Sequence, residues 1–215
     1  MFTAVLCAAL VVPPAEPVLT SKRDGTPGDP VNLRLVATRE ELVRAFCAAG
    51  WVTADPVTVR SSLRIGASVV LNRPYPSAPV SDLYLFGRAQ DVAFERALGS
   101  ARTRHHVRFW RAGCDATGRP VWLGAGTFDV RVGRGPATGK LTHRIAPDVD
   151  TERDGILADL ARGGGLSAAR VEPRGGPFSG RNGEGDRYFT DGGVGAGVLT
   201  SGTGCQRTLR GGQRR

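Results

Sequence analysis

The chain has 215 residues, of which 40% are hydrophobic, and its formal net charge is +9. This length fits one domain of ordinary size, and the apolar content excludes an intrinsically disordered chain. No apolar run reaches the roughly 20 residues that a membrane-spanning helix needs. We predict a single domain of the α/β (α+β) class, mainly an antiparallel sheet with about three helices packed on it.

The first 30 residues are the least typical of a folded domain. Residues 1–12 form an apolar run about as long as the core of a secretory signal, but they lack the basic segment that precedes such a core. A signal, a membrane anchor and a misassigned start all remain open. Proline-rich residues 13–30 are typical of a linker or an extended arm. We therefore predict an apolar segment with a linker over 1–23, a folded domain over 24–200 and a disordered basic tail over 201–215.

Helix signals occur in three places. Thr38 and Glu41 have the spacing of a capping box, and Gly50 provides a residue for positive φ at the end of that helix. Asp55 and Pro56 begin a second predicted helix, which extends to about Leu71. A third helix is expected to begin at 151–154, where Thr-Glu-Arg-Asp resembles a capping box, and to end at the glycines of 163–165.

Strand signals occupy most of the remaining chain. Alternating or apolar runs predict strands at 31–36, 83–86, 92–94, 186–190 and 194–199. The clearest strands are 104–111 and 121–131, which flank CDATGRP, a segment with the turn residues of a hairpin.

Composition also limits the partners. The positive charge comes from 27 arginines and 2 lysines, and no zinc-finger, helix-turn-helix or RNA-recognition pattern accompanies it. Nucleic acid is therefore not expected as a partner, although binding of another polyanion stays open. The four cysteines lie far apart without a CxxC pair, which argues against a cysteine-type zinc site and leaves disulfide pairing undetermined.

Several long segments resemble the LssY C-terminal domain family, among them LYLFGRAQDVAFE, RHHVRFWRA, RPVWLGAGTFD and GRNGEGDRYFTDG. The resemblance covers about Asp24 to Leu199. It implies a bacterial protein associated with type I secretion, with membrane-embedded or secretion-system proteins as partners. It also implies a place in the cell envelope, with the cytoplasm as the alternative, but no particular reaction. The chain has His143-Arg144 where many relatives carry paired histidines.

The three histidines suggest a polar site. Neighbouring strand residues point to opposite faces, so His105 and His106 cannot both bind one metal ion. His106, Arg108 and Trp110 share one face, whereas His105, Val107 and Phe109 share the other, which looks more like core. If Arg104 pairs with Asp129, the hairpin register places His106 opposite Thr127, and a shift by one residue would undo this placement.

A divalent metal such as zinc could then bind His106, His143 and Asp150, with an open position for water. Three further side chains would orient these ligands: Arg104, Asp129 and Asp148. The alternative is structural, because Asp148 and Asp150 precede a helix that acidic residues can cap. Arg104 and Asp129 can equally be a plain cross-strand pair.

A second candidate site consists of Arg181 and Arg187, which could bind a carboxylate or phosphate. The alternative interpretation of these two arginines is that they are surface charges on a hairpin whose turn is Asn182-Gly183. From these features we expect an envelope-associated accessory or ligand-binding module. A metal-assisted hydrolase with a His/His/Asp site and a polyanion binder are the alternatives.

Overall fold

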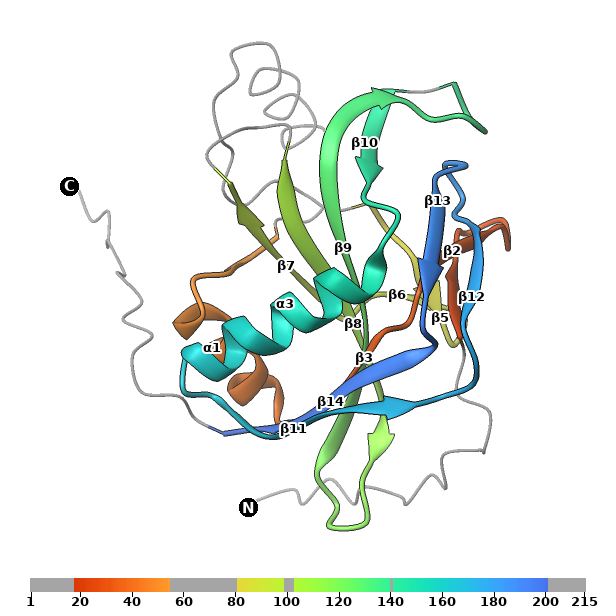
Figure 1. Cartoon of the computed structure of the whole chain (residues 1–215). Helices are drawn as coiled ribbons and strands as arrows, with labels where there is room; N and C mark the ends of the chain where they lie inside the picture. Colours follow the sequence, from red (N-terminus) through yellow and green to blue (C-terminus); the bar gives the residue numbers. More distant parts are fainter. Residues whose placement is uncertain (1–17, 55–80, 99–102, 140, 201–215) are drawn as a thin grey trace, which may run out of the picture.

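An eight-stranded sheet forms the centre of the computed structural model, which describes residues 18–54, 81–98, 103–139 and 141–200 (Figure 1). In spatial order its strands are β11 (Leu166–Pro173), β14 (Gly193–Leu199), β3 (Leu33–Val36), β9 (Pro120–Arg134), β8 (Arg104–Cys114), β7 (Val92–Ala97) and β4 (Val52–Thr53). Strand β10 (Leu141–Ile145) pairs with the C-terminal part of β9. The pairing of β14 with β3 is parallel, and the other pairings in this sheet are antiparallel.

Helices α1 (Arg39–Ala48) and α3 (Val149–Arg162) cover one face of the sheet. The alternating residues of β8 explain this contact, because Val107 and Phe109 are fully buried in the same core as Phe46 of α1 and Ile156 of α3. Thr38 and Glu41 form the predicted capping box at the start of α1, and Gly50 has the predicted positive φ, 81°.

The opposite face of the sheet carries smaller β elements. A four-stranded sheet has the order β2 (Pro27–Pro30), β1 (Leu19–Ser21), β5 (Tyr84–Leu85) and β6 (Arg88–Ala89). Strands β12 (Phe178–Arg181) and β13 (Arg187–Thr190) form a two-stranded hairpin. A second apolar core lies on this face, and its buried members are Val31, Leu83, Leu85, Trp110, Leu123 and Ala125.

The predicted fold class is wrong. The described residues are 51% strand and 16% helix, and they contain two helices rather than about three. The predicted helix over 55–71 lies outside the described residues. Strands β1, β2, β11 and β12 form where no strand was predicted, because they are short or rich in glycine, proline and charge. Backbone hydrogen bonds to neighbouring strands, rather than a local apolar pattern, stabilise them.

Helix α3 begins earlier than predicted. Asp148 is its N-cap, and its carboxylate accepts hydrogen bonds from the backbone N–H groups of Asp150 and Thr151. The Thr151 hydroxyl donates to the same carboxylate instead of capping the helix itself. The alternative interpretation of Asp148 as a helix cap is therefore confirmed.

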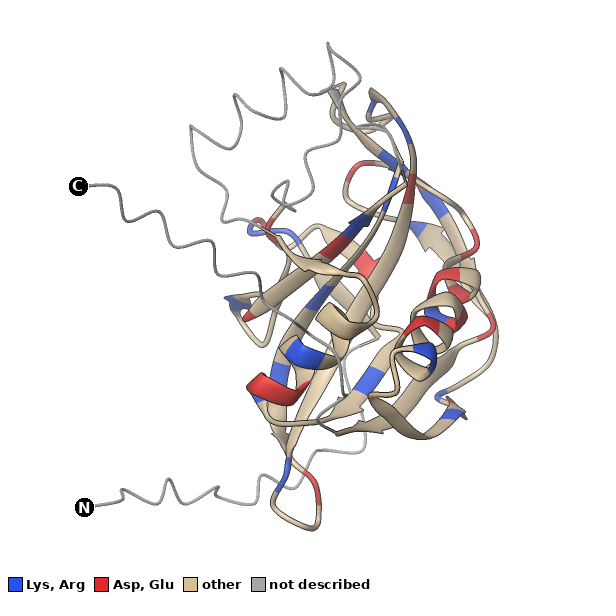
Figure 2. Ribbon diagram, turned by 90° about the vertical axis from the view of Figure 1, so that its left-hand side faces the viewer, with Lys and Arg blue, Asp and Glu red and all other residues tan. Residues whose placement is uncertain are grey.

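Three further findings concern the surface, the cysteines and the length of the helices. Basic and acidic residues are interspersed along the elements, without separation into one basic and one acidic side in the view of Figure 2. Cys47 and Cys114 are both disulfide-bonded. No helix in the described part of the chain is long and apolar enough to span a membrane.

Candidate functional site

A polar cavity of about 90 Å³ lies on the face of the central sheet that the helices do not cover. Strands β8, β9 and β10 form one wall, and β2 and the turn between β12 and β13 contribute to the others. The charged and histidine side chains that line it are Lys22, Asp29, Asp82, Arg104, His106, Arg108, Asp129, His143 and Glu184.

The register of β8 and β9 builds the wall of this cavity. Arg104 lies opposite Asp129, and His106 lies opposite Thr127. The predicted register is therefore confirmed. The pairing shifts by one residue between Cys114 and Arg111, next to the turn, and is regular from Arg111 to Arg104. Since side chains alternate along a strand, Arg104, His106 and Arg108 all point to the cavity side.

Asp129 is the centre of a buried charge network. Its Oδ2 accepts a hydrogen bond from Arg104 Nε at 2.8 Å, and its Oδ1 lies 3.0 Å from His106 Nε2. Arg104 also contacts Glu95 Oε2 through Nη1 at 2.8 Å. The side chain of Asp129 is almost completely buried, so an unpaired carboxylate here would be strongly disfavoured.

Burial raises the pKa of Asp129, but His106, Arg104 and His143 outweigh it and hold this pKa well below its ordinary value. The ion pair with Asp129 also shifts the pKa of Arg104. Burial lowers its pKa, whereas the charges of Asp129 and Glu95 raise it by more. The ionised pair is therefore the stable state at neutral pH.

The contacts of His106 define its tautomer. Arg108 Nη1 lies 3.3 Å from His106 Nδ1, and a guanidinium can only donate. Nδ1 of a neutral His106 must then accept, so the proton is on Nε2 and points to Asp129. Thr127 Oγ1 lies 3.0 Å from the same Nε2. Both ring nitrogens of His106 are thus occupied by protein contacts.

Arg108 connects the sheet to the smaller β elements. Its Nη1 contacts Asp29 Oδ2 at 3.3 Å, and its Nε donates to the carbonyl oxygen of Ser81 at 2.9 Å. Asn182, in the turn after β12, donates to the other oxygen of Asp29 at 3.0 Å. Burial lowers the pKa of Arg108, and the charge of Asp29 opposes this effect. These contacts extend the network from β8 to the far wall of the cavity.

The structure brings His106 and His143 to the same cavity, as the sequence predicted. His143 reaches it from β10, where it pairs with Val132 of β9. The neighbouring Arg144 forms an ion pair with Asp186. The predicted site residues that face the cavity therefore come from three adjacent strands, β8, β9 and β10.

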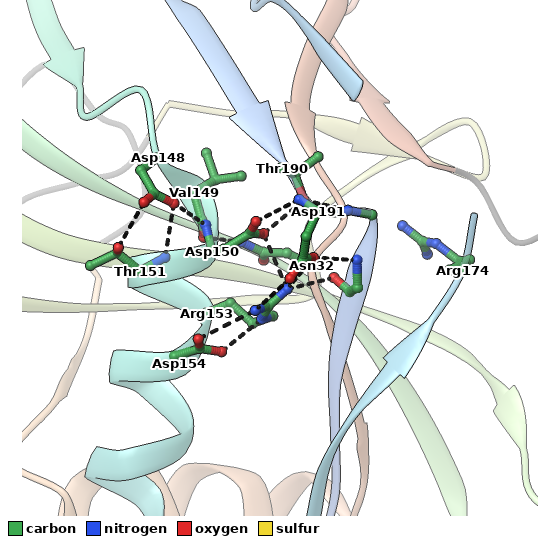
Figure 3. A network of polar contacts seen from close by, with 12 residues as sticks. Asn32, Asp148, Val149, Asp150, Thr151, Arg153, Asp154, Arg174, Thr190 and Asp191 are labelled. Atoms are coloured by element: carbon green, nitrogen blue, oxygen red, sulfur yellow. Dashed lines mark hydrogen bonds and ion pairs between the residues drawn. The ribbon is translucent and has the colours of Figure 1, made fainter. Parts of the chain in front are cut away.

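Asp150, the third predicted metal ligand, is not part of this cavity. Its Oδ1 accepts from the hydroxyl of Thr190 at 2.7 Å, and its Oδ2 accepts from the backbone N–H of Asp191 at 2.6 Å. Arg153 lies among three carboxylates, those of Asp150, Asp154 and Asp191 (Figure 3). These contacts fasten the start of α3 to the turn between β13 and β14, so Asp150 has a structural role here.

His105 points to the helix side of the sheet, as predicted. Its Nδ1 lies 2.7 Å from Glu152 Oε2, and its ring stacks on Phe128 with centroids 4.7 Å apart. This contact ties α3 to β8. The two adjacent histidines therefore belong to different layers.

Arg181 and Arg187 are direct cross-strand partners in the β12–β13 hairpin. Both are exposed and line one surface pocket together with Pro147, Ser179 and Phe189. The structure thus brings the two arginines together, on an outer surface separate from the cavity.

Sequence reasoning missed Asp29 and Asn182 as members of the network. Asp29 lies in a segment that was interpreted as a linker, and Asn182 was assigned to a turn. Their role depends on contacts across 153 residues of sequence, which no local pattern reveals. Arg108 could have been found, because its position two residues after His106 places it on the same strand face.

The residues present fit a metal poorly. The described part of the chain contains no group of three or more His, Cys, Asp or Glu side chains suited to hold a metal ion. His106 would also have to give up its contact with Arg108 or with Asp129 before either nitrogen could bind one. The metal site stays a prediction, and its carboxylate ligand cannot be Asp150 in this arrangement.

The family model described as LssY C-terminus matches residues 12–194. The chain belongs to the LssY C-terminus family. Comparison of this LssY C-terminus chain with curated proteins and with solved structures finds no significant match. The matched range contains all the residues that line the cavity, so the cavity belongs to the family domain itself.

Proposed function

We propose that this LssY C-terminus chain is a ligand-binding module, and that its polar cavity binds a small neutral group rich in hydroxyls. The observation that carries this proposal is that six of the seven charged side chains in the cavity wall form ion pairs with one another, and the seventh, Asp82, accepts a hydrogen bond from Gln90. Arg104 pairs with Asp129, Arg108 with Asp29 and Lys22 with Glu184. A ligand therefore need not supply a charge, but it meets many hydrogen-bond donors and acceptors.

The size of the cavity limits the ligand further. One water needs roughly 10–15 Å³ of such volume, so about 90 Å³ accommodates several waters or one small polar group. A hydroxyl-bearing end group, such as the edge of a sugar ring, fits this limit. The preformed network around His106 keeps the wall in place before the ligand arrives, which lowers the entropic cost of binding.

Calorimetric titration with monosaccharides, glycine and inorganic phosphate as separate probes tests this proposal. We expect saturable binding of a hydroxylated probe and about tenfold weaker binding by His143→Gln, the effect of one lost hydrogen bond. His105→Gln is the matched control, because His105 faces the helices, and it should leave the affinity unchanged. Binding of phosphate alone, or equal losses in both variants, would contradict the proposal.

The proposed location is the cell envelope, where the module would be accessory to a membrane-embedded or secretion-system protein. Disulfide bonds at Cys47 and Cys114 support this location, because disulfides persist in oxidising compartments such as the bacterial periplasm. Cell fractionation tests it directly. Recovery of the protein entirely in the cytosolic fraction, with both cysteines as free thiols, would contradict this part of the proposal.

Metal-assisted hydrolysis is a second candidate function, favoured by one observation. His106 and His143 line the same cavity as the ionised carboxylate of Asp129. Elemental analysis of untagged protein tests this candidate. Stoichiometric metal that is lost in His143→Ala would support it, whereas substoichiometric metal or metal unchanged by that variant would exclude it.

A further inference from the structure

The outer face of the β12–β13 hairpin concentrates positive charge. Because side chains alternate, the exposed residues of both strands lie on this face, namely Ser179 and Arg181 of β12 and Arg187 and Phe189 of β13. Like charges placed directly opposite each other on antiparallel strands repel. The pairing of Arg181 with Arg187 is therefore unfavourable unless something else compensates it.

Neither arginine is neutralised by a carboxylate among the residues that the structure describes. Arg181 donates from Nη1 to the carbonyl oxygen of Gly185 at 2.8 Å, which positions its guanidinium and leaves its other N–H groups available. Arg187 forms no ion pair with any described residue. The two arginines therefore present several donors and two positive charges on one face.

The nearest acidic side chains of the hairpin are committed elsewhere. Asp186 is buried and pairs with Arg144, and Glu184 accepts from Lys22 and from the hydroxyl of Thr138. The charge of the outer face is consequently not balanced by the turn that connects its two strands.

An apolar surface borders the two arginines. Phe189 is 50% exposed, and it lines the same surface pocket as Pro147 and Ser179. An aromatic ring at this exposure buries little area against the protein itself, so a ligand with an apolar part beside its charge would gain from covering it.

We propose that Arg181 and Arg187 form a binding site for a phosphate group that carries an adjacent apolar moiety, with Phe189 contacting that moiety. The two guanidinium groups would donate to the phosphate oxygens, the geometry in which arginine binds phosphate most strongly. This site is separate from the cavity around His106, and neither proposal depends on the other. The phosphate ester can be a soluble compound or the headgroup of an anionic lipid.

Titration with phenyl phosphate and with inorganic phosphate, followed by amide chemical shifts, tests the site. We expect saturable binding, centred on residues 179–189, that is tighter for phenyl phosphate. Arg181→Gln and Arg187→Gln should each weaken it about three- to tenfold, because an exposed pair is screened by solvent. Phe189→Ala should remove the advantage of phenyl phosphate while leaving inorganic phosphate unchanged.

Vesicles of phosphatidylcholine with and without phosphatidylglycerol distinguish the two sources. Cosedimentation that needs phosphatidylglycerol and both arginines identifies a lipid headgroup, whereas binding of phenyl phosphate without cosedimentation identifies a soluble ester. Arg170→Gln is the control, because it removes the same charge from an exposed arginine paired with Glu172. An equal loss in Arg170→Gln, or no binding of any probe, would overturn the proposal.

Thermal unfolding provides an independent check on folding. Arg187→Gln relieves the cross-strand repulsion, so without phosphate it should melt at the same temperature as the wild type or slightly higher. Added phenyl phosphate should raise the melting temperature of the wild type more than that of the variant, because the variant binds it more weakly. A variant that melts well below the wild type would instead assign Arg187 a structural role and contradict the site.

Discussion

His105 and His106 are neighbours in β8, yet they contact carboxylates on opposite sides of the central sheet. His105 Nδ1 lies 2.7 Å from Glu152 of α3, and His106 Nε2 lies 3.0 Å from Asp129 of β9. The first contact attaches a helix to the sheet, and the second supports the wall of a polar cavity. The two-residue period of the strand therefore separates a structural histidine from a candidate functional one.

Because of Asp129, the free energy of unfolding should decrease at acid pH. Its pKa is lower in the folded chain than in the unfolded chain, so the carboxylate stabilises the fold above roughly pH 4 and loses this effect as the pH falls through the folded-state value. Asp129→Asn should cost about 3 kcal/mol at pH 7, and its difference from the wild type should shrink below about pH 4. Urea unfolding across this range measures both effects.

The matched control for Asp129→Asn is Glu172→Gln, which removes a partly exposed carboxylate from β11. Because a surface pair contributes little, its effect should stay below about 0.5 kcal/mol at every pH. If Glu172→Gln lost as much stability as Asp129→Asn, net charge and not the buried network would control the stability of the fold at acid pH.

Two glycines should respond to alanine with opposite signs. A Cβ on Gly124 of β9 would lie 2.5 Å from the buried ring of Phe109 and 3.1 Å from Leu33 Cβ, so Gly124→Ala should destabilise the fold by about 1–3 kcal/mol. Gly155 lies within α3 and would meet nothing within 4 Å. Gly155→Ala should stabilise the fold by up to about 1 kcal/mol. Equal effects of both changes on the unfolding midpoint would contradict the packing of β9 against β8.

Asn32 should be intolerant of substitution. Its side chain donates to the carbonyl oxygens of Gly126 and Val149 and accepts from the N–H of Gly126, and it is 2% exposed. Asn32→Ala leaves these buried groups without partners, which should cost about 2–4 kcal/mol. Unfolding in urea measures this loss. A cost below about 0.5 kcal/mol, as for an ordinary surface change, would show that the groups find other partners.

The cysteines should resist alkylation in the oxidised protein. Iodoacetamide added without a reductant should leave Cys47 and Cys114 unmodified in a peptide map, and a reductant should expose both. Reduction should also lower stability by about 2–4 kcal/mol. Complete alkylation of both residues in protein made in an oxidising compartment would contradict the disulfide bonds.

The sequence predicted the β8–β9 hairpin in its observed register, because alternation on both strands and a short polar turn agree. The capping box at Thr38 was equally visible, since its signal is local. The small β elements that close the cavity were not predictable in this way. Asp29 lies in a proline-rich segment, and its position depends on contacts with Arg108 and Asn182, which are distant in the sequence. Asp150 was assigned to the site only because it lies near His143 in the sequence, and the backbone directs it to Thr190 and Asp191 instead.

The most direct measurement of the central claim is the long-range ¹H–¹⁵N spectrum of the imidazole rings, recorded with and without the monosaccharide that binds in calorimetry. The chain has three histidines, so each ring can be assigned. We predict that the neutral form of His106 carries its proton on Nε2, that the His143 ring nitrogens shift on addition of the sugar, and that His105 is unchanged. A His106 protonated at Nδ1, or a sugar that shifts His105 and leaves His143 unaffected, would contradict the proposed network and cavity.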